Sequence, residues 1–282
     1  MSPVAPAVIA LLCRTSDRTP RASSGAAALA PLVAARLGVE AATVGAPGPA
    51  RPAPWGDDLR DSRGCLLEAG GQVADALGAG AVPVLLAGDC SIALATLTAV
   101  AATRADARVL WLDAHGDFNT PDTTPSGFLG GMCLAGACGS WDAGLGLEPI
   151  APERVVLAGV RDLDARERDL LGASAATVIG ASLETLVYVQ NALDRAPVYV
   201  HLDLDVLDPA SFPAQFPADG GLSPSKLYDL FEAVAGECEL VGLEVTAFEA
   251  PDDQLELSAA ASTAVEVLEP LLAALSTAGD RV

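Results

Sequence analysis

The sequence predicts an α/β fold in which a mostly parallel sheet carries helices on both faces. Short aliphatic and β-branched runs alternate with longer Ala- and Leu-rich amphipathic stretches along the whole chain, as expected of repeated strand–helix units. The chain has 282 residues, of which 51% are hydrophobic, so it can fill a large core. No repeat of solenoid period is visible, and we expect residues 1–282 to form a single domain.

Eight runs predict strands, because each is rich in aliphatic and β-branched residues. They are Val8–Leu12, Ala42–Val44, Val82–Leu86, Val109–Leu112, Val155–Val160, Ala176–Ile179, Val198–Leu204 and Leu240–Val245. The run Ala42–Val44 gives the weakest signal.

Seven stretches predict helices, because their apolar residues recur at helical spacing. They are Gly25–Leu37, Leu59–Leu77, Ser91–Ala102, Ala165–Leu171, Leu183–Leu193, Ser223–Val234 and Leu255–Ala274. The Pro- and Gly-rich segment Gly45–Gly56 reads as a surface loop, since the strand–helix rhythm resumes on both sides of it.

Charge and cysteine usage exclude several classes of protein. The net charge is −21, which disfavours nucleic-acid binding, because that needs clustered cations. The apolar run Val4–Cys13 is too short to span a membrane and lacks a basic segment before it, so we read it as a buried strand. The six cysteines show no CxxC spacing, which favours reduced thiols in the cytoplasm. We expect the partner to be a small-molecule substrate and not a membrane. Homo-oligomerisation stays open.

Three predicted strands end in residues that can bind a metal ion. Gly88-Asp89-Cys90-Ser91 follows the strand Val82–Leu86, Asp113-Ala114-His115-Gly116-Asp117 follows Val109–Leu112, and the strand Val198–Leu204 leads through His201 and Asp203 to Asp205. In an open parallel sheet, ligands bind beyond the carboxyl ends of the strands.

The spacing of two within the last two clusters puts their ionisable groups on one face of a strand. Several buried carboxylates need a cation to neutralise them, and imidazole with carboxylates suits a pair of divalent ions such as Mn²⁺. The only two histidines of the chain, His115 and His201, lie inside these clusters. A structural Ca²⁺ or Mg²⁺ site is the alternative, but histidine disfavours it.

These segments resemble the arginase/agmatinase (ureohydrolase) family. The quoted matches are AGDCS at Ala87–Ser91, DAHGDFNTP at Asp113–Pro121, SGFLGGM at Ser126–Met132, GVRDLD at Gly159–Asp164, HLDLDVLDP at His201–Pro209 and GLEVTAFEAP at Gly242–Pro251. The resemblance implies a three-layer α/β/α domain with a dinuclear manganese site, and therefore two Mn²⁺ ions as cofactors.

The resemblance also implies a role for each ligand. Asp113 and Asp203 match the carboxylates that bridge the two metals, His115 and Asp117 match terminal ligands, and Asp205 matches the second carboxylate of the DxD pair. Asp117 would also accept a hydrogen bond from the hydroxide nucleophile and carry the proton to the leaving amine.

Cys90 stands where the family has a further histidine ligand. A thiolate is softer than imidazole and is anionic, so other divalent metals become acceptable. Alternatively, Cys90 is a small buried thiol and the metal loses one ligand.

Three further departures concern the reaction. By spacing, Ala247 replaces the glutamate that holds the guanidinium group, Gly130 replaces the histidine that shuttles protons, and Glu244 stands where aspartate is usual. These changes argue against ordinary arginine hydrolysis.

The resemblance places Asn119 and Ser126 near the α-carboxylate of an amino-acid substrate and Asp164 near its α-amino group. Asn119 and Ser126 fit a turn-forming role equally well. This trio suits an amino acid better than a plain amine.

We therefore expect a hydrolase that converts Nω-hydroxy-L-arginine to L-ornithine and hydroxyurea, with catalytic roles for Asp117, His201 and Glu244. An N-hydroxyguanidine is less basic than a guanidine and so needs a counter-charge less. It could present its oxygen to the metals or to His201, which should face the same side of the strand as Asp203. Alternatively, His201 is a packed strand residue hydrogen-bonded to a backbone carbonyl. Two other functions stay open: hydrolysis of another amidine, and a catalytically silent protein that binds metal.

Overall fold

The computed structural model describes residues 6–278 and contains an eight-stranded sheet in which all strands are parallel. The strands are β1 (Pro6–Leu11), β2 (Ala41–Val44), β3 (Val82–Ala87), β4 (Arg108–Leu112), β5 (Val155–Val160), β6 (Thr177–Gly180), β7 (Val198–Asp203) and β8 (Leu240–Thr246). All eight predicted strands are confirmed. Val4, at which the predicted apolar run begins, lies outside the described residues.

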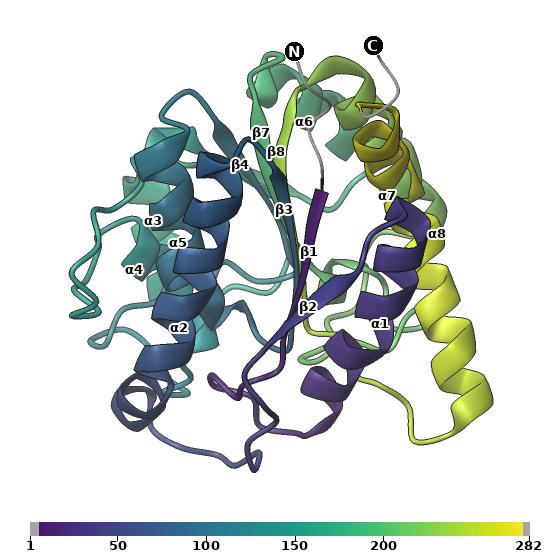
Figure 1. Cartoon of the computed structure of the whole chain (residues 1–282). Coiled ribbons are helices and arrows are strands. Elements are labelled where there is room, and N and C mark those ends of the chain that lie inside the picture. The colour runs from purple at the N-terminus through teal and green to yellow at the C-terminus, as the bar shows by residue number, and fades with distance from the viewer. Residues whose placement is uncertain (1–5, 279–282) are drawn as a thin grey trace.

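Helices cover both faces of the sheet, which confirms the three-layer arrangement (Figure 1). They are α1 (Arg21–Leu37), α2 (Trp55–Gly78), α3 (Ala93–Thr103), α4 (Cys133–Ala137), α5 (Ala165–Ala173), α6 (Thr185–Leu193), α7 (Pro224–Glu237) and α8 (Gln254–Ala278). Helices α2 to α5 pack on one face, and α1 with α6 to α8 on the other.

Several helix boundaries differ from the predicted ones, and one helix was not predicted. Helix α2 begins at Trp55 rather than Leu59, because Asp57 and Asp58 in its first turn favour the positive end of the helix dipole although they break the apolar pattern. Helix α4 was not predicted, since five residues are too few to show helical periodicity.

The long C-terminal helix α8 is apolar enough to cross a membrane by length and composition alone. In the fold it packs against α1 and α7. Its residues Ala264, Leu268 and Leu271 are fully buried there, so its apolar face forms part of the core.

The strand order is β2-β1-β3-β8-β7-β4-β5-β6. The chain therefore leaves β3 on one side of the pair β8–β7 and returns as β4 on the other side. A parallel sheet binds ligands at the carboxyl ends of the strands where the strand order reverses in this way. The carboxyl ends of β3, β8, β7 and β4 are thus the place to look for a site.

One cysteine prediction is wrong: Cys13 and Cys65 form a disulfide, with Cα atoms 6.3 Å apart. Cys13 follows β1, and Cys65 lies on α2, which packs over that strand. The two residues are 52 positions apart, so no local motif marks the pair. The other four cysteines are free thiols.

Asp17, in the loop after β1, is a buried carboxyl group, and only one of its two oxygens has a hydrogen-bond partner. Its Oδ2 accepts the Thr15 N–H at 3.0 Å, whereas Oδ1 has no partner among the described residues. Burial, followed by the charge of Asp89, raises the pKa of Asp17 from 3.8 to about 7. The folded state thus binds this proton more tightly than the unfolded state, and stability falls as the pH rises from about 4 to about 7.

We predict that Asp17→Asn raises the free energy of unfolding at pH 8 by about 1–3 kcal/mol relative to wild type, and much less at pH 4. Urea unfolding at both pH values measures the difference. Asp75→Asn, at an exposed site on α2, should change stability by less than about 0.5 kcal/mol at either pH. An equal effect of Asp17→Asn at pH 4 and pH 8 would contradict the prediction.

Candidate active site

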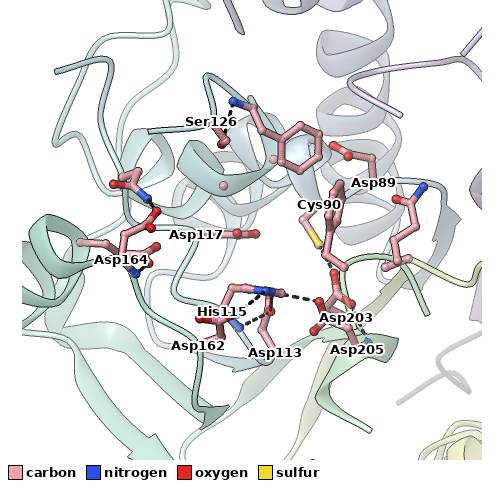
Figure 2. Close-up of a pocket in the computed structure, with 18 of the residues that line it drawn as sticks. Asp89, Cys90, Asp113, His115, Asp117, Ser126, Asp162, Asp164, Asp203 and Asp205 are labelled. Atoms are coloured by element: carbon pink, nitrogen blue, oxygen red, sulfur yellow. Dashed lines mark hydrogen bonds and ion pairs between the residues drawn. The ribbon is translucent and has the colours of Figure 1, made fainter. Parts of the chain in front are cut away.

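A cavity of about 220 Å³ opens at the carboxyl ends of the central strands (Figure 2). Its wall is strongly acidic. The carboxyl groups that line it belong to Asp89, Asp113, Asp117, Asp162, Asp164, Glu167, Asp203 and Asp205.

The register of the central strands builds the floor of this cavity. Trp111 on β4 is paired with His201 on β7, and His201 with Glu244 on β8. Side chains two residues apart on a strand share a face. The next row toward the cavity therefore consists of Asp113, Asp203 and Thr246, and this fits the prediction that His201 and Asp203 share a face.

We call this row, the one nearer the cavity, the outer row. Its two carboxylates, Asp113 and Asp203, accept hydrogen bonds from backbone and side-chain donors. Asp113 accepts the His115 N–H at 2.7 Å and the Trp111 Nε1–H at 3.1 Å. Asp203 accepts the Asp205 N–H at 2.7 Å. Each carboxylate is thus fixed in orientation before any ligand binds.

Asp205 lies beyond the strand, because β7 ends at Asp203 and a 3₁₀ turn follows over Leu204–Val206. The prediction that Asp205 shares the strand face therefore rests on the wrong local structure. The turn nevertheless brings Asp205 Oδ2 to 2.9 Å from His115 Nδ1, and Asp113 Oδ1 lies 3.3 Å from the same nitrogen.

Cys90 reaches the cavity from a tight turn after β3. Asp89 accepts the Ser91 N–H at 2.9 Å and so caps the 3₁₀ turn that leads into α3. The Cys90 Sγ atom donates to Asp203 Oδ2 at 2.8 Å and lies 2.9 Å from Thr246 Oγ1. Cys90 is thus directed at the row of carboxylates.

His201 and Glu244 lie beneath this row and do not line the cavity. The His201 ring stacks on Trp111 with centroids 3.5 Å apart. Its Nδ1 lies 2.6 Å from Glu244 Oε1, and its Nε2 lies 3.3 Å from Cys90 Sγ. Tyr199 donates to Glu244 Oε2 at 2.8 Å. The histidine is therefore fixed between Glu244 and the thiol.

Asp117 occupies the opposite wall, in the loop after β4. Its φ of 47° lies in the left-handed region, which turns its buried side chain into the cavity. Cys133, at the start of α4, donates to Asp117 Oδ2 at 3.5 Å. This contact between a second thiol and Asp117 was not predicted from the sequence.

The crowding of carboxyl groups perturbs their protonation. Burial, and then neighbouring carboxylates, raise the pKa of Asp117 and Asp203, and raise the pKa of Asp205 to about 7. Burial lowers the pKa of His115, but hydrogen bonds to Asp113 and Asp205 outweigh it and raise that pKa to about 12.

The donor set fits divalent metal ions. Candidate ligand atoms of Cys90, Asp113 and His201, and those of Asp113, His115 and Asp205, lie within 4.8 Å of one another. Thiolate, imidazole and carboxylate are the ligands that transition metals prefer, and a bound cation would remove the repulsion between the buried acids.

The predicted substrate contacts all line the cavity, on its outer side. Asn119 donates to Asp164 Oδ2 at 3.0 Å and accepts from Thr123 at 3.0 Å. Ser126 accepts the Phe128 N–H at 3.2 Å. These bonds support the turn-forming role, while the position on the wall remains compatible with substrate binding.

Phe128 explains how the structure accommodates Gly130. A Cβ atom at Gly130 would lie 2.5 Å from Cε1 of the Phe128 ring. The ring therefore occupies the space into which a larger residue 130 would project.

Ala247 presents only a methyl group to the cavity, and its backbone is held by two hydrogen bonds. Its N–H donates to the Gly88 carbonyl at 3.3 Å, and its carbonyl accepts the Gln215 N–H at 3.0 Å. Its φ is 63°. No carboxylate is thus offered from this position.

Four cavity residues lie outside every stretch singled out from the sequence for the site: Arg18, Glu167, Gln215 and Phe216. Arg18 follows β1, so the strand-end argument applied to the first strand could have found it. Glu167 lies on α5, and Gln215 and Phe216 lie in a loop without a recognisable pattern. Phe128 lies in the quoted stretch Ser126–Met132, but the sequence gives it no role.

An all-parallel α/β sheet whose carboxyl edge gathers a thiol, an imidazole and carboxylates is typical of metal-dependent hydrolases. The sequence model of the arginase family matches residues 45–273, and the chain belongs to the arginase family. It is accordingly a hydrolase that acts on amidino groups.

Individual relatives agree with this assignment. The chain is 38% identical over 257 residues to the N(omega)-hydroxy-L-arginine amidinohydrolase of Streptomyces lavendulae, covering 91% of this chain and 93% of that protein. It is 38% identical over 173 residues to the arginase of Bacillus caldovelox, covering 55% and 57%. The crystal structure of arginase from Bacillus subtilis strain 168 superposes with a TM-score of 0.82 at 27% identity, covering 95% and 98%.

We predict that Gly130→His lowers the free energy of unfolding by about 1–3 kcal/mol, because the new side chain must displace the Phe128 ring. In the double variant with Phe128→Ala, this additional loss should largely disappear. Denaturant unfolding of the four chains of the double-mutant cycle measures the coupling. Strictly additive effects would show that the two positions do not compete for space.

Proposed function

We propose that this protein hydrolyses Nω-hydroxy-L-arginine to L-ornithine and hydroxyurea. The observation that carries the proposal is the methyl group of Ala247 on the cavity wall, beside an acidic donor set that is otherwise complete. A protonated guanidinium would find no counter-charge at this position, whereas an N-hydroxyguanidine is less basic and needs it less. The overall similarity to an amidinohydrolase named for this substrate supports the assignment.

We propose that two divalent ions, best Mn²⁺, are held by six side chains. They are Cys90, Asp113, His115, Asp117, Asp203 and Asp205. When bound, such ions supply a hydroxide nucleophile near neutral pH because they acidify coordinated water. The Cys90 thiol widens the choice of metal, because softer divalent ions also bind thiolate.

The residues of the chain then orient the substrate and move protons. Cys133 donates to Asp117 Oδ2 and so orients this carboxylate, which would take up the proton of the nucleophile and deliver it to the leaving nitrogen. Asn119, Ser126 and Asp164 face the amino-acid end of the substrate.

His201 and Glu244 act as positioning residues in this proposal. Glu244 binds Nδ1 of His201, which leaves Nε2 directed at Cys90 and fixes the thiol over Asp203. A ligand whose supporting partner is fixed in this way keeps its orientation. We also propose that residues 1–282 form one domain, since all described strands join one sheet.

A second candidate, hydrolysis of another uncharged amidine, is favoured by the same methyl group of Ala247. The catalytically silent protein that the sequence left open is not supported, because the chain belongs to a family of hydrolases. The buried acids argue against it, because keeping them together without a function is unfavourable.

We predict that kcat/KM for Nω-hydroxy-L-arginine exceeds that for L-arginine by about 10- to 100-fold, because one charge-assisted contact is missing for the guanidinium. Ala247→Glu should shift the ratio toward arginine. Assays of ornithine release with both substrates measure it.

Ala173→Glu is the matched control for the added charge, at an exposed site on α5. It should leave the ratio unchanged. Equal turnover of the two substrates by the wild type would refute the assignment to hydroxyarginine.

We predict that the protein binds two divalent ions per chain after loading with Mn²⁺, and that Asp203→Asn lowers this number. Elemental analysis measures the stoichiometry. In the loaded protein, alkylation of Cys90 by iodoacetamide should be suppressed relative to the metal-free protein, because a ligating thiolate is protected. A stoichiometry of one or none, or equal labelling in both states, would argue against the proposed site.

A further inference from the structure

Arg18 is a cationic side chain on the cavity wall that has no role in the proposed reaction. It is the only lysine or arginine among the described residues that line the cavity. His115, the other basic residue there, is already bonded to Asp113 and Asp205. Arg18 forms no ion pair within residues 6–278. Its charge is therefore available to a ligand.

The guanidinium of Arg18 is also incompletely satisfied. Its Nε atom is buried and has no hydrogen-bond partner among the described residues. A buried donor without a partner is unfavourable, and a guanidinium is the side chain best shaped to bind a carboxylate with two parallel hydrogen bonds. The group that would satisfy Arg18 is thus an anion with paired oxygens.

The backbone around Arg18 is anchored on both sides. Ser16 donates to Asp89 Oδ1 at 2.6 Å. Thr19 donates to Glu249 Oε2 at 2.8 Å and accepts from Gln215 at 3.3 Å. Arg18 therefore projects from a segment whose neighbouring residues are already held before a ligand binds.

Arg18 lines the cavity beside Phe128. Its guanidinium carbon lies 4.8 Å from the centroid of the Phe128 ring. Phe128 in turn donates its N–H to Ser126, which Figure 2 shows apart from Asp113, Asp203 and Asp205. Phe128 therefore connects Arg18 to Ser126, one of the residues expected at the amino-acid end of the substrate.

We infer that Arg18 binds the α-carboxylate of the substrate and so selects amino acids over amines that lack this group. The inference rests on the proposed function for the identity of the substrate, but it can be tested without turnover. A carboxylate entering a cavity lined by acids is repelled unless a cation receives it, and Arg18 is the cation placed to do so.

The test compares the binding of L-ornithine and 1,4-diaminobutane, which differ by the carboxylate alone. Isothermal titration in Mn²⁺-containing buffer is carried out with the wild type, Arg18→Gln and Arg18→Lys. We expect the wild type to bind ornithine more tightly than diaminobutane. Arg18→Gln should weaken ornithine binding by about 10- to 100-fold, with diaminobutane changed less than about twofold. Arg18→Lys should restore part of the affinity, because it keeps the charge but not the paired donors.

Arg166→Gln is the matched control, because Arg166 is exposed on α5 and does not line the cavity. It should leave both affinities unchanged. Thermal unfolding of each variant checks that the fold is retained.

The inference is overturned if Arg18→Gln leaves ornithine binding unchanged, if it weakens both ligands equally, or if the wild type does not bind ornithine. Equal weakening of both ligands would show that Arg18 serves only to pack against Phe128. Failure of the wild type to hydrolyse hydroxyarginine, with ornithine binding still dependent on Arg18, would refute the proposed function and leave this inference standing.

Discussion

The register between β4, β7 and β8 is the constraint on which the site depends. It sets Trp111, His201 and Glu244 side by side in one row and Asp203 beside Thr246 in the next, with Asp113 one residue past the end of β4. A shift of one residue in any strand would turn its side chains to the opposite face of the sheet. The inner row would then lose the stacking of His201 on Trp111, and the outer row would lose a carboxylate. The positions of the side chains in the candidate site therefore depend directly on the register of these three strands.

The outer row is electrostatically unfavourable until a cation joins it. Burial and neighbouring carboxylates hold the pKa of Asp203, in this row, and that of Asp117, on the facing wall, above their usual range. In the inner row, His201 and Glu244 are hydrogen-bonded to each other. The floor therefore has a lower layer whose polar side chains are hydrogen-bonded to one another and an upper layer whose carboxyl groups repel one another. Only the upper layer lines the cavity.

Much of this arrangement could be predicted from the sequence, because strands and strand ends leave local patterns. The eight strands follow from apolar runs, and Cys90, Asp113 and His115 follow from the residues just beyond them. Asp205 was assigned to the right site on the wrong local structure, since a spacing of two does not show that the strand has already ended. The Cys13–Cys65 disulfide and the cavity position of Arg18 depend on contacts between distant segments, which no local pattern records. Burial also separates His201 and Glu244 from the cavity, and their residue types alone do not reveal depth.

The Phe128 ring beside Gly130 also bears on how such a site changes over evolutionary time. A larger side chain at position 130 would meet the Phe128 ring as it stands, whereas a smaller residue 128 would leave room for it. The two positions therefore change more easily together than position 130 changes alone. Packing on the cavity wall thus constrains which residues can follow one another at position 130, independently of the substrate.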